Sequence, residues 1–165
     1  MTAQIKKALD KSLEILVMVV VAVLVLDVLW QVFTRFVIKD PSNWTEELAT
    51  FLLIWVALLG AAVALGRGAH LGIDYFVGKL PEPARVKTEL FVFACVFLFS
   101  LLVMVVGGLD LVVTTFHLRQ ISPAMHLDMG YVYLAVPISG CFLVLYSLIG
   151  FVERLHRILH PGEPA

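Results

Sequence analysis

Three polar side chains interrupt the first long apolar run of the sequence at helical spacing. Asp27, Gln31 and Arg35 stand at i, i+4 and i+8, so a helix would place them as a stripe along one side. A charged side chain at the centre of a membrane costs roughly 2.5–3.5 kcal/mol, and such residues relay protons or ions or pair with another helix. Because no second acid lies deep inside the apolar runs beside Asp27, we favour a structural role, in which this intramembrane polar stripe pairs with another helix or a partner subunit.

Polar residues also mark the start of the second apolar run. Trp44 suits the aromatic belt at a membrane surface, and Glu46 and Glu47 would lie in the first helical turn, where the helix dipole favours acids. Thr45 is the expected N-cap of this helix. The two glutamates are explained equally well as capping acids and as contacts to a partner.

Small residues recur at intervals of four in the same run, at Gly60, Ala64 and Gly68. In lipid this spacing lets two helix backbones approach closely, either within this chain or across a subunit interface. Arg67 and His70 leave the far end of the run, where they could contact lipid headgroups or a partner loop. The candidate interface with a partner or with lipid is therefore Trp44, Glu46, Glu47, Gly60, Ala64, Arg67, His70 and Asp74.

Sets of residues that support catalysis or metal binding do not stand out in this sequence. The five histidines lie outside the long apolar runs, where a membrane haem would need them, and Cys95 and Cys141 each stand alone inside a run. A glycine-rich phosphate loop and a nucleophile beside a base are both missing. We therefore predict no catalytic, cofactor-binding or metal-binding residues and expect a protein that is not an enzyme.

The composition defines the elements that would hold these residues. The 165 residues are 61% apolar and 15% charged, and their mean hydropathy is +0.96. A soluble domain has more surface than so few charges can cover, and the net charge of −1 offers no basic surface for nucleic acid. Four runs are long enough to cross a bilayer as helices, at 13–36, 48–66, 90–109 and 129–152. The sequence predicts a single all-α membrane domain over 1–165.

The distribution of Lys and Arg predicts the orientation of the four spans. Nine of these 12 residues fall on one side and three on the other, so the positive-inside rule places both termini in the cytoplasm. We expect 13–36 to be a retained span, since no Ala-x-Ala cleavage site follows it. The apolar residues of 73–80 recur at helical spacing and predict a short amphipathic cytoplasmic helix between spans two and three, although an irregular loop would also fit. Pro137 is expected to kink the fourth span.

Two stretches of the sequence resemble the small membrane subunit of tripartite ATP-independent periplasmic (TRAP) transporters, the DctQ-like family. The first stretch is Trp44-x-Glu46-Glu47 followed by Trp55, Gly60, Ala61, Arg67, His70 and Ile73-Asp74. The second stretch is Ser122-Pro123-Ala124 followed by 130–140, and it is similar to the last-span region of that family. The first span matches the family in character only.

The resemblance implies a bacterial or archaeal inner-membrane protein that works with two others. One is a large M-type membrane subunit, which holds the substrate and sodium sites and moves as an elevator. The other is a periplasmic substrate-binding protein that delivers an organic acid, a C4-dicarboxylate or another carboxylate such as a sialic acid. The small subunit would then be a non-catalytic scaffold that braces the large subunit and anchors it among the membrane lipids.

Two other functions are compatible with the sequence alone. Asp27 could serve a small autonomous proton-coupled carrier, and the segment from Arg67 to Arg85 could be the working surface of a lipid-binding assembly factor. A carrier normally needs a midplane site built from polar groups or from broken helices in matched halves. This sequence has one carboxylate and one proline on different spans, which suits a scaffold better.

Overall fold

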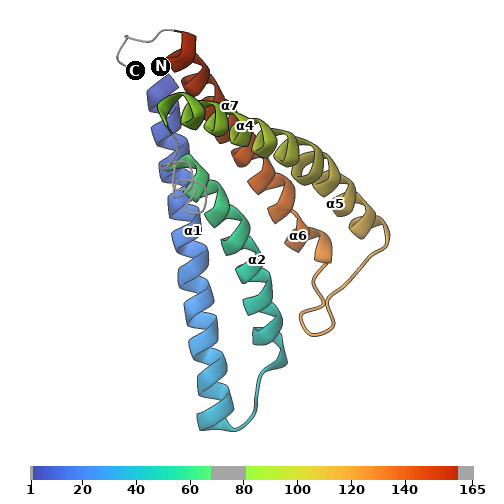
Figure 1. Ribbon diagram of the computed structural model, residues 1–165. Coiled ribbons are helices and arrows are strands. Elements are labelled where there is room, and N and C mark those ends of the chain that lie inside the picture. Colours follow the sequence, from blue (N-terminus) through green and yellow to red (C-terminus); the bar gives the residue numbers. More distant parts are fainter. Residues whose placement is uncertain (1, 68–80, 160–165) are drawn as a thin grey trace.

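The computed structural model describes residues 2–67 and 81–159, which are mostly helical and include non-helical connections at 39–42 and 118–128 (Figure 1). Helix α1 (Thr2–Phe33) continues into a π-helical turn, η1 (Thr34–Ile38), and α2 (Asn43–Gly66) returns beside it. The third crossing consists of α4 (Glu82–Phe99), the π-helical segment η2 (Ser100–Gly107) and α5 (Gly108–His117). The fourth consists of α6 (Met129–Tyr133) and α7 (Ala135–Leu159).

Four helices are long and apolar enough to cross a membrane, as the sequence predicts: Leu9–Ile38, Asn43–Gly66, Ala84–His117 and Met129–Leu155. Each is longer than the predicted run, because the helix continues into polar flanks that hydropathy excludes. The 34 residues of the third span measure about 50 Å at 1.5 Å per residue, whereas the hydrocarbon core is about 30 Å thick. This span therefore tilts or projects beyond the core. The amphipathic helix predicted over 73–80 lies outside the described residues.

The four spans lie in an open row. Helix α1 packs against α2, α2 packs against α7, and α7 packs against α4 and η2. Among the described residues α1 makes no packing contact with α4, η2 or α5, so the row does not close into a bundle. Figure 1 shows two hairpins that lie close together where α1 begins and α7 ends and that spread apart toward the opposite end. We call the first the termini end and the second, which holds the connections 39–42 and 118–128, the loop end.

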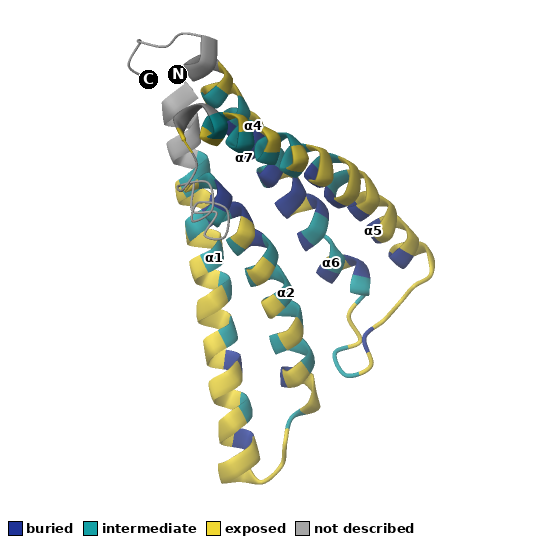
Figure 2. Cartoon of the chain, in the orientation of Figure 1, coloured by how far each residue is buried: buried dark blue, intermediate teal, exposed yellow. Residues whose placement is uncertain are grey.

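The open row leaves most apolar side chains uncovered (Figure 2). Buried residues make up 44% of the most apolar part of the fourth span but only 6% of that part of the first. The hydrophobic core cluster forms where α1, α2, η2 and α7 meet and consists of Leu13, Leu59, Ala62, Leu65, Met104, Leu143 and Tyr146. An uncovered apolar surface of this extent requires lipid or another protein against it.

Glycines set how closely the third and fourth spans approach each other. A Cβ atom at Gly140 would lie 2.8 Å from the Cβ of Met104, and a Cβ at Gly150 would lie 2.5 Å from the ring of Phe93. Lipid provides no hydrophobic drive between helices, so their association depends on close van der Waals packing of this kind. The glycines therefore fix the separation of these two spans.

The fourth span is interrupted at Leu134, one turn before Pro137. Proline has no N–H, so the carbonyl of Tyr133 loses the donor that a regular helix would supply. On either side of the break the ladder continues, because Leu134 N–H donates to Gly130 O at 3.1 Å and Ile138 N–H donates to Leu134 O at 3.2 Å. The structure thus shows an interruption of the helix one turn before Pro137, where the sequence predicts a kink.

Replacing Gly140 by alanine should destabilise the chain, because the new methyl group must displace Met104. Overpacking costs about 1–3 kcal/mol, partly offset by a gain of about 1 kcal/mol in helix propensity. Gly60→Ala is the matched control, since a Cβ there meets nothing within 4 Å. In thermal unfolding in detergent we expect a lower midpoint for Gly140→Ala and an unchanged or higher one for Gly60→Ala. Equal midpoints would contradict the described packing of these spans.

Candidate functional site

A carboxylate at the loop end ties the second span to the connection between the third and fourth. Oε1 of Glu47 accepts a hydrogen bond from Ala124 N–H, and Oε2 accepts one from Met125 N–H, each at 3.0 Å. Hydrogen bonds to an ionised acceptor are roughly twice as strong as neutral ones. We call this contact the Glu47 clamp. It joins α2, just after its first turn, to a loop 77 residues further along the chain, so the expected place of Glu47 in the first turn is wrong.

The clamped loop is itself ordered by backbone hydrogen bonds. Ser122 N–H donates to Leu127 O at 2.9 Å, and Met129 N–H donates to Gln120 O at 2.9 Å. The Ser122 side chain is 2% exposed, and its hydroxyl accepts a bond from Leu127 N–H at 3.4 Å. His126 lies at a positive φ of 53°, which allows the tight turn between the two hydrogen-bonded halves of the loop. Glu47 thus holds a compact turn rather than a loose segment.

The clamp brings together the two stretches that resemble the DctQ-like family, Trp44-x-Glu46-Glu47 and Ser122-Pro123-Ala124. Beside it is a recess of about 200 Å³, whose walls include Phe51, Pro123 and Met129. Glu46 is exposed in the first turn of α2, and Trp44 is about half exposed. One glutamate of the pair is therefore committed to an internal contact, whereas the other faces outward.

The predicted N-cap of α2 is wrong by three residues. The helix begins at Asn43, and its N-cap is Ser42, which has an extended backbone. Thr45 is fully buried in the first turn and donates from Oγ1 to Ser42 O at 2.8 Å. Sequence reasoning took the hydroxyl closest to the acids as the cap, but the turn begins directly after Pro41-Ser42.

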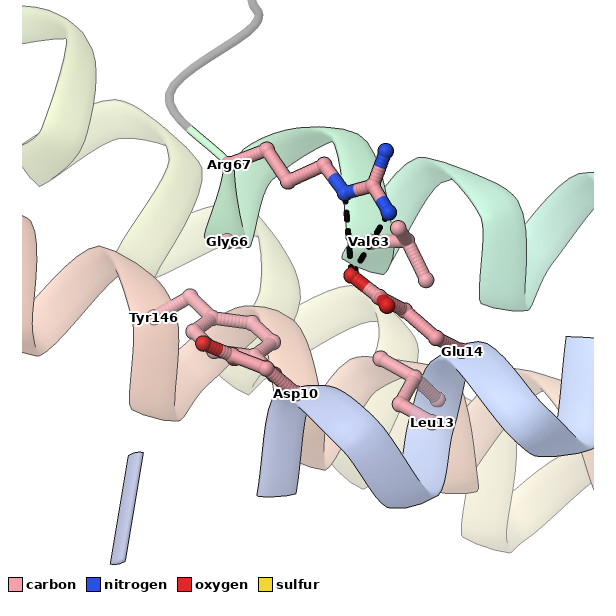
Figure 3. A pocket seen from close by; sticks show the side chains of 7 residues that line it. All are labelled: Asp10, Leu13, Glu14, Val63, Gly66, Arg67 and Tyr146. Carbon is pink, nitrogen blue, oxygen red and sulfur yellow. Dashed lines mark hydrogen bonds and ion pairs between the residues drawn. The ribbon is translucent and has the colours of Figure 1, made fainter. Parts of the chain in front are cut away.

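A second polar group ties three helices together at the termini end (Figure 3). Arg67, the C-cap residue of α2, donates from Nε and Nη2 to Glu14 Oε1 of α1, at 3.0 and 2.7 Å. The Tyr146 hydroxyl of α7 donates to Asp10 Oδ1 at 2.6 Å. Leu13 is almost completely buried between these pairs. Sequence reasoning missed Asp10 and Glu14, although their i, i+4 spacing at the start of the first apolar run places them on one helix face.

The third and fourth spans are joined at the same end by Glu89. Its Oε1 accepts from Arg85 Nε and its Oε2 from Arg154 Nε, both at 3.0 Å. The Arg154 guanidinium carbon also lies 5.4 Å from the centroid of the Phe93 ring, within cation–π range. Polar ties at the termini end thus connect α1 to both α2 and α7, and α4 to α7.

Exposure increases along the intramembrane polar stripe. Asp27 is 6% exposed, and neither of its carboxylate oxygens has a hydrogen-bond partner among the described residues. Gln31 is partly exposed and Arg35 is exposed, in the π-helical turn η1. Arg35 is therefore exposed although it belongs to the same stripe as the buried Asp27.

The small residues of α2 form a face that the described part of the chain covers only in part. A Cβ at Gly60 would meet nothing within 4 Å, and Ala64 is partly exposed. Two of the predicted interface residues, His70 and Asp74, lie outside the described residues, as does Gly68 of the same small-residue pattern. The remaining members are thus distributed over the loop end, the open face of α2 and the termini end.

These features define a multi-pass, all-helical membrane protein whose polar residues connect helices. Among residues 2–67 and 81–159, no group of three or more His, Cys, Asp or Glu could hold a metal ion. The chain belongs to the family of tripartite ATP-independent periplasmic transporters, DctQ component, whose family model matches residues 24–157. The proteins of this family are transporter subunits and not enzymes, and their location is the inner membrane.

Individual relatives agree with this assignment. The sialic acid TRAP transporter small permease protein SiaQ of Vibrio cholerae is 31% identical over 161 residues, which cover 98% of this chain and 91% of the relative. The C4-dicarboxylate TRAP transporter small permease protein DctQ of Rhodobacter capsulatus is 33% identical over 113 residues, 67% of this chain and 49% of the relative. The sialic acid TRAP transporter permease protein SiaT of Haemophilus influenzae is 40% identical over 73 residues, 42% of this chain and 12% of the relative.

Replacing Glu47 by glutamine should loosen the loop at 118–128. The amide keeps one acceptor but turns a donor group toward one of the two loop N–H groups, so one of the two charge-assisted hydrogen bonds is lost. Hydrogen exchange of peptides that cover Ala124 and Met125 should become about tenfold faster or more. Glu46→Gln, next to the clamp, should leave exchange unchanged. If both variants exchange at the wild-type rate, the clamp does not order the loop.

Proposed function

We propose that this chain is the non-catalytic scaffold and anchor subunit of a TRAP transporter that imports an organic acid, and that it braces a large M-type membrane subunit. The main support is the open row of four spans. Only 6% of the most apolar part of its first span is buried, and a Cβ at Gly60 of α2 would meet nothing within 4 Å among the described residues. A row held by internal ties, with uncovered faces on both sides, suits a subunit that is completed by a larger one.

The relatives support this proposal for the partner and the substrate class. The match to the Haemophilus influenzae permease protein SiaT takes up 12% of that relative, so a similar stretch occurs there within a much longer polypeptide. The relatives are named for sialic acid and for C4-dicarboxylates, which are both organic acids. We infer a carboxylate of one of these kinds as the transported solute and sodium as the coupling ion, the latter from the family resemblance.

We also infer which end of the row meets each partner. With nine of 12 basic residues on its side, the termini end faces the cytoplasm. The loop end then faces the periplasm, where a substrate-binding protein would approach Asp40, Arg119 and the loop that the Glu47 clamp holds. Glu46, Trp44 and the Gly60 face are the candidate contacts with the large subunit, and Arg67 and His70 are those with the large subunit or with lipid.

The proposal predicts that the purified chain transports nothing in proteoliposomes, whereas its complex with the large subunit and the binding protein takes up substrate. Gly60→Leu should lower recovery of the complex in mild detergent without unfolding the chain, because its side chain enters the uncovered face. Gly107→Leu in the third span is the control, since a Cβ there meets only a backbone oxygen at 3.7 Å. Uptake by the chain alone would overturn the scaffold function. Equal recovery of the two variants would exclude the Gly60 face as the interface.

Asp27→Asn distinguishes a scaffold from an autonomous carrier. A charged carboxylate without a partner is costly inside a protein or a membrane, so an uncharged side chain of the same shape should be accommodated. We expect the variant complex to assemble and to retain most of its uptake. Asp27→Leu, which removes the polar group altogether, tests whether the site needs a hydrogen-bonding side chain. Normal assembly combined with complete loss of uptake in Asp27→Asn would indicate the carrier instead.

A further inference from the structure

A polar recess of about 250 Å³ opens at the termini end between α2, α4 and α7. Its walls include the charged side chains of Arg67, Glu153 and Arg154 and the rings of Phe93 and Tyr146. The recess lies where three apolar spans end, at the level at which lipid headgroups meet water. A cavity at this depth is accessible from the membrane surface and has charged groups of both signs.

Two glycines create the space. A Cβ at Gly66 would lie 3.0 Å from the Tyr146 ring, and a Cβ at Gly150 would lie 2.5 Å from the Phe93 ring. Both rings therefore rest against bare helix backbone. The hydrogen bond from the Tyr146 hydroxyl to Asp10 holds the first ring in place. The described walls of the recess thus come from packed helices.

The two arginines of the recess are held by acids outside it. Glu14 accepts Nε and Nη2 of Arg67, so the edge of the guanidinium with Nη1 is turned away from Glu14 (Figure 3). Glu89 accepts Nε of Arg154, which lies over the Phe93 ring. Side chains that are already held in place lose less conformational freedom on binding a ligand. Planar guanidinium groups match the oxygens of a phosphate well.

The charged residues of this region favour a ligand that carries both a positive and a negative charge. Glu153 lines the recess next to the arginines, with Oε2 3.6 Å from Arg154 Nη1. A carboxylate has about four lone-pair sites, so Glu153 can accept an ammonium group while it stays near Arg154. The acids around the recess offset its arginines, and a purely anionic headgroup would gain little from the local potential.

We propose that the recess binds the headgroup of a zwitterionic phospholipid with a primary ammonium group, such as phosphatidylethanolamine. Arg67 and Arg154 hold its phosphodiester, and Glu153 accepts its ammonium group. The acyl chains then extend along the uncovered apolar sides of the neighbouring spans. This assignment is independent of the proposed transport function, because it depends only on the recess and on its position at a membrane surface.

Native mass spectrometry of the purified full-length chain, alone and with its large subunit, tests the proposal. The probes are phosphatidylethanolamine, phosphatidylcholine, phosphatidylglycerol and inorganic phosphate. We expect the wild type to retain phosphatidylethanolamine in preference to the other three. Arg67→Gln should weaken this binding about tenfold or more, in proportion to the loss of a charge-assisted hydrogen bond. Lys87→Gln, the same charge change at an exposed position of α4 away from the recess, should leave it unchanged.

Glu153→Gln separates headgroup recognition from general stability. This variant should still bind phospholipid but should lose the preference for the primary ammonium over the trimethylated one. The proposal would be overturned if the wild type retained no lipid in preference to another, or if it preferred phosphatidylglycerol. It would also be overturned if the wild type bound inorganic phosphate as well as it binds phosphatidylethanolamine. Unchanged selectivity in Glu153→Gln, or equal weakening by Arg67→Gln and Lys87→Gln, would overturn the assigned contacts.

Discussion

The second span is fixed at both of its ends by charged groups, and the order of the row depends on those two contacts. At the loop end Glu47 accepts two backbone N–H groups from the connection before the fourth span. At the termini end Arg67 donates two hydrogen bonds to Glu14 of the first span. Apolar side chains gain little by facing one another instead of lipid, so directional contacts near the membrane surfaces have to set rotation and register. Sliding or turning α2 would break at least one of them.

Between those ends the helices depend on close packing. The third and fourth spans meet at Gly108, Gly140 and Gly150, where an added Cβ would contact the opposite span at about 3 Å or less. Two irregular segments also meet there, since the π-helical segment η2 packs against α7, which starts directly after the break before Pro137. Such irregular backbone is tolerated in a membrane only where other protein covers it. The buried side of η2 includes Met104, which lies against Gly140 of α7.

The sequence was sufficient to predict the number and type of the spans but not their contacts. Hydropathy identified four helices, because an uninterrupted apolar run can satisfy its backbone groups in lipid only as a helix. It underestimated the third span, since Arg85 and His117 are helical residues that hydropathy assigns to loops. Glu47 was recognised as a candidate, yet its partner lies 77 residues away and is a backbone group that carries no side-chain signal. Thr45 was misplaced because several hydroxyl and acidic residues compete for one helix start.

The same contacts weigh against an independent transport cycle. A carrier has to expose its site to the two sides of the membrane in turn, which requires one part to move against another. In this chain the termini end is cross-linked along the row by Glu14–Arg67, Asp10–Tyr146 and Glu89–Arg154, and the loop end by the Glu47 clamp. Asp27, the acid that could hold a proton, lies buried on the first span, which packs mainly against α2. A subunit whose spans are fixed relative to one another is suited to a static role beside a subunit that moves.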